Sequence, residues 1–121
     1  MVGTETMNES TPIADLWAAY EAATIAERKA WDRMVRIESQ HGEAEAGFRH
    51  PRVVVADAIY FEASARKAAL RKVILSRPVR SQEGMAVLRD MARDLTSGRY
   101  VPGDVRTALK AARGAGWRLA A

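Results

Sequence analysis

The sequence predicts an all-α fold, a small helical bundle in which two long antiparallel helices are followed by two shorter helices. Three observations predict it. The 121-residue chain is rich in alanine, its apolar side chains recur at helical spacing, and proline or glycine separates the periodic stretches. We expect residues 1–10, which are polar and show no periodicity, to form a flexible tail. Residues 11–121 then fit a single helical domain.

The first helix is expected to begin at Pro12, with Thr11 as its N-cap, and to continue to Gly42. A helix of this length cannot fold back on itself, so its apolar stripe must pack against another element. An intramolecular core is the favoured interpretation, and a dimer seam with Trp17 and Trp31 two heptads apart is the alternative. The stripe consists of Ile13, Leu16, Trp17, Tyr20, Ala23, Ala30, Trp31, Met34, Val35 and Ile37.

Residues 42–52 combine glycine, proline and mixed charge, which predicts a break. The second helix is expected from about Val53 to Leu75. Its first residues, 53–55, are expected to form a short extended stretch, because β-branched runs are poor helix openers. Small side chains let helix axes approach closely, and they predict the seam along which this helix packs. The seam consists of Ala58, Ala65, Ala68 and Ala69, with Val54, Ile59, Phe61, Val73 and Ile74.

A linker over residues 76–80 leads to the third helix, for which Ser81 is the expected N-cap and Gly98 the end. A third helix in this position would bury one apolar face against the two long helices. That face consists of Met85, Leu88, Met91, Ala92 and Leu95.

Pro102 is expected to open a short fourth helix, because proline is favoured at the first helical position. Gly114 and Gly116 end it, and Trp117 is expected to anchor the remaining residues to the body of the protein. The inward residues of this helix are Val105, Ala108, Leu109 and Ala112.

Composition excludes several classes of protein. The chain contains no cysteine, so disulfides, thiolate metal sites and cysteine nucleophiles are excluded. No stretch free of Asp, Glu, Lys and Arg exceeds five residues, which rules out a membrane span. The N-terminus lacks the basic start and apolar stretch of a signal peptide, so we expect a cytoplasmic location.

Charge is divided unevenly along the chain. Residues 1–50 carry five Lys and Arg against nine Asp and Glu, a net of −4, whereas residues 51–121 carry fourteen against six, a net of +8. This division has two interpretations. In one, the basic half presents a surface to an anionic partner; in the other, an acidic first helix lies beside a basic second one.

A cluster of cations near the end of the second helix is the candidate partner-binding or phosphate-binding site. Nucleic-acid phosphates are one possible partner of such a cluster. A solvated face or a protein contact is favoured, because helix C-termini attract cations and Glu62 stands four residues before Arg66. The cluster also lacks aromatic, Asn and Gln side chains that stack on or read bases. It consists of Arg66, Lys67, Arg71, Lys72, Arg77 and Arg80.

A second basic set on the third and fourth helices follows the order of a helix-turn-helix. The joint between these helices is longer than the usual turn, and the fourth helix offers few base-reading side chains. Nucleic-acid binding by the second and fourth helices is therefore the alternative function. The set consists of Arg89, Arg93, Arg99, Arg106, Lys110 and Arg113.

No constellation of residues predicts catalysis, a metal site or a cofactor. The one grouping with metal-ligand chemistry is His41, Glu43, Glu45 and His50, and it lies in the expected linker without helical i,i+4 spacing. Serine-nucleophile and phosphate-cradling motifs are absent from the sequence. We therefore expect a protein that is not an enzyme.

The segment 74–86, ILSRPVRSQEGMA, resembles a motif of small helical proteins in alphaproteobacteria and their prophages. In those proteins a helix ends, a proline linker follows, and a Ser- or Thr-capped helix opens with Gly-Leu or Gly-Met. The resemblance covers about residues 59–98. It departs after Ala86, where Val-Leu-Arg-Asp replaces the more usual Lys-Ala-Arg pattern. It implies a mobile-element origin, such as an adaptor or an inhibitor of host machinery.

These observations together predict a non-enzymatic protein-interaction or regulatory module. Its expected partner is another protein or a second copy of the chain, and nucleic acid is the alternative partner. Such a module should present a continuous apolar or charged surface once it is folded.

Overall fold

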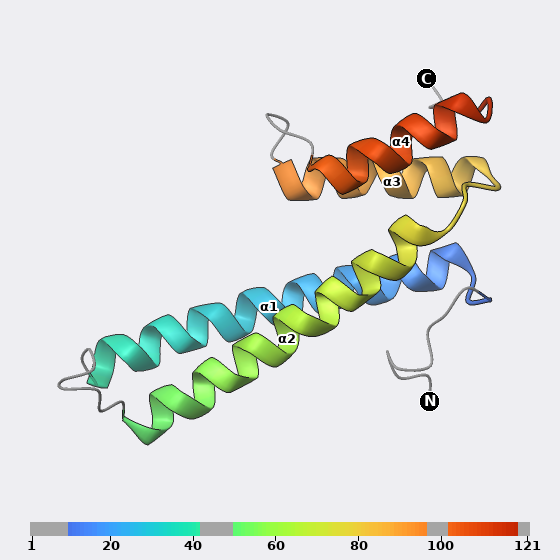
Figure 1. Cartoon of the computed structure of the whole chain (residues 1–121). Helices are drawn as coiled ribbons and strands as arrows, with labels where there is room; N and C mark the ends of the chain where they lie inside the picture. Colours follow the sequence, from blue (N-terminus) through green and yellow to red (C-terminus); the bar gives the residue numbers. More distant parts are fainter. Residues whose placement is uncertain (1–9, 42–49, 97–101, 119–121) are drawn as a thin grey trace. The chain divides into compact units, whose positions relative to one another are not determined.

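The computed structural model describes residues 10–41, 50–96 and 102–118. Across these residues the chain is all-α, with two long antiparallel helices followed by two shorter ones, as the sequence predicts (Figure 1). No helix in the described ranges combines the length and the apolar character that crossing a membrane requires. The helices are α1 (Ile13–His41), α2 (Pro51–Ser76), α3 (Gln82–Thr96) and α4 (Gly103–Gly114).

The chain divides into two compact units. The hairpin unit consists of residues 18–70 and therefore contains most of α1 and α2. The terminal unit consists of residues 1–17 and 71–121, which include α3 and α4. Each unit has buried apolar residues of its own, and each is described by itself below.

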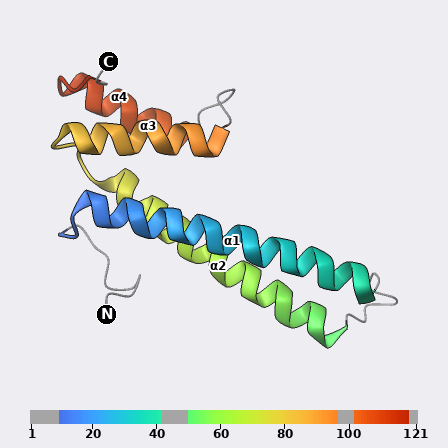
Figure 2. The same ribbon diagram turned by 180° about the vertical axis from the view of Figure 1, so that it is seen from behind.

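In the hairpin unit α1 and α2 lie side by side and antiparallel (Figures 1 and 2). A buried cluster near the connected end of the hairpin, where α1 ends and α2 begins, holds them together, with Tyr60 packed against it. Trp31 of α1 meets the ring of Tyr60 edge to face, with 5.1 Å between the ring centroids. Tyr20 and Leu70 are buried nearer the other end of the unit. The cluster consists of Met34, Ile37, Val53 and Ala56.

In the terminal unit α3 and α4 pack against each other. α3 has a strongly one-sided apolar pattern, which is typical of a helix that buries one face and exposes the other. Most of the inward residues expected for α3 and α4 are buried, whereas Ala92 and Ala108 are half-buried and the Leu95 side chain lies outside the described part of the structure. The buried residues of this unit are Leu16, Ile74, Met85, Val87, Leu88, Met91, Val105, Leu109 and Ala112.

Two helix ends follow the local signals in the sequence. Ser81 caps α3, because its Oγ accepts the backbone N–H of Gly84 at 3.1 Å. At the end of α4, Gly116 adopts a φ of +99°, which favours glycine. The Trp117 N–H then donates to the carbonyl oxygen of Ala112 at 3.0 Å, closing a Schellman motif.

Two predictions about helix starts need correction. α1 begins at Ile13, and the carbonyl of Pro12 accepts the first intrahelical hydrogen bond in place of that of Thr11. The valine run at 53–55 is helical and not extended. His50 explains this start, because its carbonyl accepts the first N–H groups of α2 and its Nδ1 accepts the Arg52 N–H at 3.1 Å.

The packing seam predicted for the second helix is wrong over most of its length. The four alanines of that seam are exposed, as are Val54, Ile59 and Phe61. The buried residues of α2 in the hairpin unit are instead Val53, Ala56 and Leu70. α2 is apolar around most of its circumference, so the spacing of its apolar residues did not identify the buried side. The predicted tail, residues 1–10, lies outside the described residues except for Ser10.

Candidate interaction surface

Exposed large apolar side chains gather on the hairpin unit. Seven of them are between 41% and 61% exposed, and all seven lie within residues 18–70. No described large apolar side chain of the terminal unit is exposed to this degree. The seven are Ile25, Trp31, Val35, Val54, Val55, Ile59 and Phe61. Single exposed apolar residues are common on proteins, whereas this group is confined to one unit.

Five of these large residues and their neighbour Tyr60 form a surface that we name the apolar strip. An aromatic chain runs along it. The ring of Tyr60 lies between that of Trp31, at 5.1 Å, and that of Phe61, at 5.6 Å. The three rings thereby join α1 to α2. On α1 the strip continues from Trp31 to Val35, four residues later. On α2 it continues from Phe61 back to Val54, seven residues earlier. The strip consists of Trp31, Val35, Val54, Ile59, Tyr60 and Phe61.

The face of α2 turned away from α1 continues this surface. Residues three, four or seven apart share one side of a helix, which places Ala58 and Ala65 in line with Val54 and Phe61. All four of these side chains are exposed, and so are Ala68 and Ala69. We name this side the outer face of α2. It consists of Val54, Ala58, Phe61, Ala65, Ala68 and Ala69.

The charges on this part of α2 balance. Between residues 54 and 69 the helix carries two acids, Asp57 and Glu62, and two bases, Arg66 and Lys67. Arg66 Nη2 lies 3.3 Å from Glu62 Oε1, in the i,i+4 arrangement that the sequence predicts. This stretch of α2 is therefore neutral in sum, although the whole chain carries +4.

The second of the predicted cluster residues, Lys67, faces inward. Its Nζ lies 3.3 Å from Glu27 Oε1 on α1 and 5.7 Å from the centre of the Tyr20 ring. The Lys67 and Glu27 side chains are 18% and 23% exposed, so this pair joins the two helices from a partly buried position. Lys67 is thus a structural cation of the hairpin unit.

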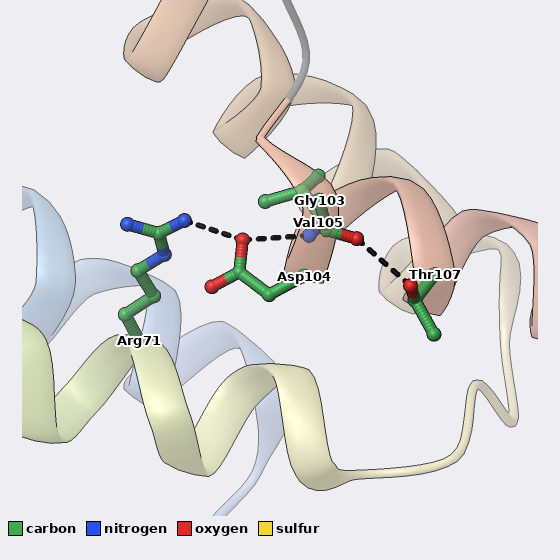
Figure 3. A network of polar contacts seen from close by, with 5 residues as sticks. All are labelled: Arg71, Gly103, Asp104, Val105 and Thr107. Carbon is green, nitrogen blue, oxygen red and sulfur yellow. Dashed lines mark hydrogen bonds and ion pairs between the residues drawn. The ribbon is translucent and has the colours of Figure 1, made fainter.

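Arg71 pairs within the terminal unit. Its Nη2 donates to Asp104 Oδ1 at 2.5 Å, and the same oxygen accepts the Val105 N–H at 2.8 Å (Figure 3). In the next turn of α4, Thr107 Oγ1 donates to the carbonyl oxygen of Gly103 at 2.8 Å. Asp104 lies in the first turn of α4, where a carboxylate is stabilised by the helix dipole.

The other three predicted cluster residues also belong to the terminal unit. Lys72 and Arg80 are exposed and Arg77 is half-buried. Arg77 and Arg80 line an open cavity of about 600 Å³ between the start of α1 and the segment that joins α2 to α3. Its described lining contains no Asp, Glu or His. The remaining lining residues are Ser10, Thr11, Pro12, Ile13, Ile74, Pro78, Val79, Ser81, Gly84 and Leu88.

The second basic set is mostly exposed. Arg93, Arg106, Lys110 and Arg113 are exposed, and Arg89 pairs with the neighbouring Asp90 at 3.2 Å. Arg99 lies outside the described residues.

The two histidines of the expected linker meet at the ends of the long helices. The rings of His41 and His50 stack with 3.8 Å between their centroids. Desolvation, followed by the charges of His50 and Arg52, lowers the pKa of His41 from its ordinary value. Glu43 and Glu45 lie outside the described residues, within which no group of three metal-ligating side chains occurs.

The sequence predicted a candidate site at the basic cluster near the end of the second helix. It did not predict the apolar strip. The available signal was the second helix itself, which is apolar on more sides than packing against one neighbour requires.

Comparison with known protein families, with curated proteins and with solved structures finds no significant match for this chain.

Proposed function

We propose that this protein is a protein-interaction module that binds through the apolar strip and the outer face of α2. The observation that carries the proposal is that, among the described residues, all seven exposed large apolar side chains lie in the hairpin unit. An apolar surface of this kind gains free energy when it leaves water, at roughly 25 cal/mol per Å². Tryptophan, tyrosine and phenylalanine supply much of the binding energy where they become buried at interfaces.

The alternative, nucleic-acid binding, has less support from the described contacts. Binding to phosphates requires cations that are free to replace counterions. Three of the six predicted cations, Arg66, Lys67 and Arg71, already lie within 3.3 Å of a carboxylate. An interface dominated by phosphate contacts would also leave the apolar strip exposed to water.

Site-specific photo-crosslinking tests the proposal. A photoreactive phenylalanine analogue replaces Phe61 in the full-length chain, in cells that naturally produce the protein, and irradiation follows. The matched control carries the analogue at Lys29, an exposed polar position of the same unit. We expect a discrete protein adduct at position 61 and none at position 29. Equal adduct yields at both positions, or no adduct at position 61, contradict the proposal.

Salt dependence separates the two functions. Titration with a short DNA duplex, a single strand and a double-stranded RNA at low and moderate salt should show no binding that falls steeply as salt rises. Strong salt-sensitive binding that is lost on charge reversal of Lys110 and Arg113 would favour the nucleic-acid alternative.

A further inference from the structure

We infer that the partner of the apolar strip is a second copy of this chain, with two hairpin units pairing through the outer faces of their α2 helices. This inference rests on the proposed function and names the partner of the same surface. In the paired arrangement the two α2 helices meet at the centre and the two α1 helices lie on the outside.

The first argument is the apolar surplus of the hairpin unit. Among its described residues five large apolar side chains are buried, whereas seven are exposed. Two helices provide one contact face between them, so a pair of helices that is apolar on further sides requires a second layer. Pairing with another copy is a common way for a small unit to acquire that layer. The five buried side chains are Tyr20, Met34, Ile37, Val53 and Leu70.

The second argument is the shape of the outer face, which is complementary to itself. Its N-terminal half carries the large residues Val54 and Phe61, and its C-terminal half carries Ala65, Ala68 and Ala69. A two-fold axis near Phe61 makes the paired α2 helices antiparallel, so Phe61 meets its own counterpart and Val54 of each copy lies opposite Ala68 of the other. Large residues opposite small ones let two helices interdigitate closely.

The third argument is charge. The outer face of α2 carries no charged residue, and Glu62 and Arg66 beside it pair with each other at 3.3 Å, so two copies can approach without the repulsion that like-charged faces produce. A strongly acidic partner would instead be matched by a surface with surplus cations. A neutral apolar face is best matched by another neutral apolar face, and the second copy supplies one.

Light scattering coupled to size-exclusion chromatography tests the inference on the full chain. We expect a mass of twice the 13.3 kDa monomer at micromolar concentrations. Phe61→Glu places a charge at the centre of the interface and should weaken the dimer by at least tenfold. Val54→Glu, as a second variant, should act in the same direction. Circular dichroism checks that both variants keep the helical content of the wild type.

Ile25→Glu is the matched control. Ile25 is 57% exposed and lies on α1 of the same unit, but it stands roughly 120° around the helix from Trp31 at 3.6 residues per turn. The same change in charge at this position should leave the dimer intact. A wild-type chain that stays monomeric at 100 µM or above, or a dimer that Ile25→Glu disrupts as strongly as Phe61→Glu, overturns the inference.

Cysteine crosslinking tests the orientation, and the cysteine-free chain provides a clean background. Single variants Ala58→Cys and Ala65→Cys are oxidised separately and as a mixture. The antiparallel pairing predicts that the mixture gives more disulfide-linked dimer than either variant alone. Crosslinking that is strongest within each single variant indicates a parallel arrangement and contradicts the proposed pairing.

The photo-crosslinking result distinguishes the two proposals. A monomeric wild type whose position 61 captures one different protein refutes the homodimer and leaves the interaction function standing. A monomeric wild type with no adduct at position 61 refutes both.

Discussion

Asp104 accepts two hydrogen bonds on one carboxylate oxygen, one from the Arg71 guanidinium at 2.5 Å and one from the Val105 N–H at 2.8 Å (Figure 3). The contact ties the final turns of α2 to the first turn of α4 within the terminal unit. It also takes a cation from the predicted binding cluster and gives it a structural role. Fewer cations are therefore available to a partner than the number of Lys and Arg in the predicted cluster.

Loss of this ion pair should destabilise the terminal unit modestly. Asp104→Asn and Arg71→Gln should each lower the free energy of unfolding by about 0.5–1 kcal/mol, because Asp104 is half-exposed and water screens the pair. Urea denaturation of both single variants and the double variant measures the coupling between the two side chains. Arg80→Gln, which changes an exposed cation of the same unit, is the control. A coupling energy near zero contradicts the interpretation.

The Lys67–Glu27 pair should behave differently, because it is partly buried. Lys67→Met should lower the free energy of unfolding by about 1–2 kcal/mol, since it leaves the Glu27 carboxylate without its cation. Glu27→Met, combined with it, should recover most of that loss, because two apolar side chains replace the pair. Thermal and urea unfolding of the single and double variants provide the comparison. A double variant less stable than either single variant would show that the pair has another role.

The His41–His50 stack should make stability depend on pH. The folded-state pKa of His41 is lowered, first by desolvation and then by the charges of His50 and Arg52. His41 therefore binds a proton more readily in the unfolded chain, where its pKa is about 6.5, than in the folded chain. Stability should be full above that pH, fall as the pH drops toward the folded-state pKa, and level off below it. NMR titration of the His41 ring measures the shift directly, and His41→Gln should flatten the stability profile between pH 5 and 7.

Two glycines should respond oppositely to alanine. Gly116 has a φ of +99°, so Gly116→Ala strains the end of α4 and should cost about 1 kcal/mol. A Cβ at Gly84 would meet its nearest neighbour, Val79 Cγ1, at 3.5 Å, which is an ordinary contact. Gly84→Ala should therefore be neutral or stabilise the protein by up to about 1 kcal/mol through helix propensity. Parallel thermal melts compare the two, and a larger loss at Gly84 than at Gly116 contradicts this account.

The cap of α3 offers a local test. Ser81→Ala removes the acceptor of the Gly84 N–H and should lower the free energy of unfolding by about 1 kcal/mol. Ser81→Asp keeps an acceptor and adds a favourable charge at the helix start, so it should retain the stability of the wild type. Urea midpoints of the two variants separate loss of the cap from a general effect of substitution at this position.

The sequence predicted much of the fold because the relevant signals are local. Proline before a periodic stretch, serine at a cap and glycine after the last turn act within a few residues of where they stand. The helices, their order and the ends marked by Ser81 and Gly116 followed from such signals. The start of α2 did not, because His50 satisfies the first N–H groups of a valine run that by itself opens a helix poorly.

The side of α2 that is buried was decided only by the tertiary structure. Ala58 and Ala65 were expected to pack inward, yet they are exposed, and Val53 and Ala56 are buried in their place. A helix that is apolar on most sides carries no periodic signal for its buried face, so the neighbouring helix makes the choice. The partners of Lys67 and other cations depend likewise on acids distant in the sequence. The sequence by itself thus determined the helices, whereas packing determined which surface remains for a partner.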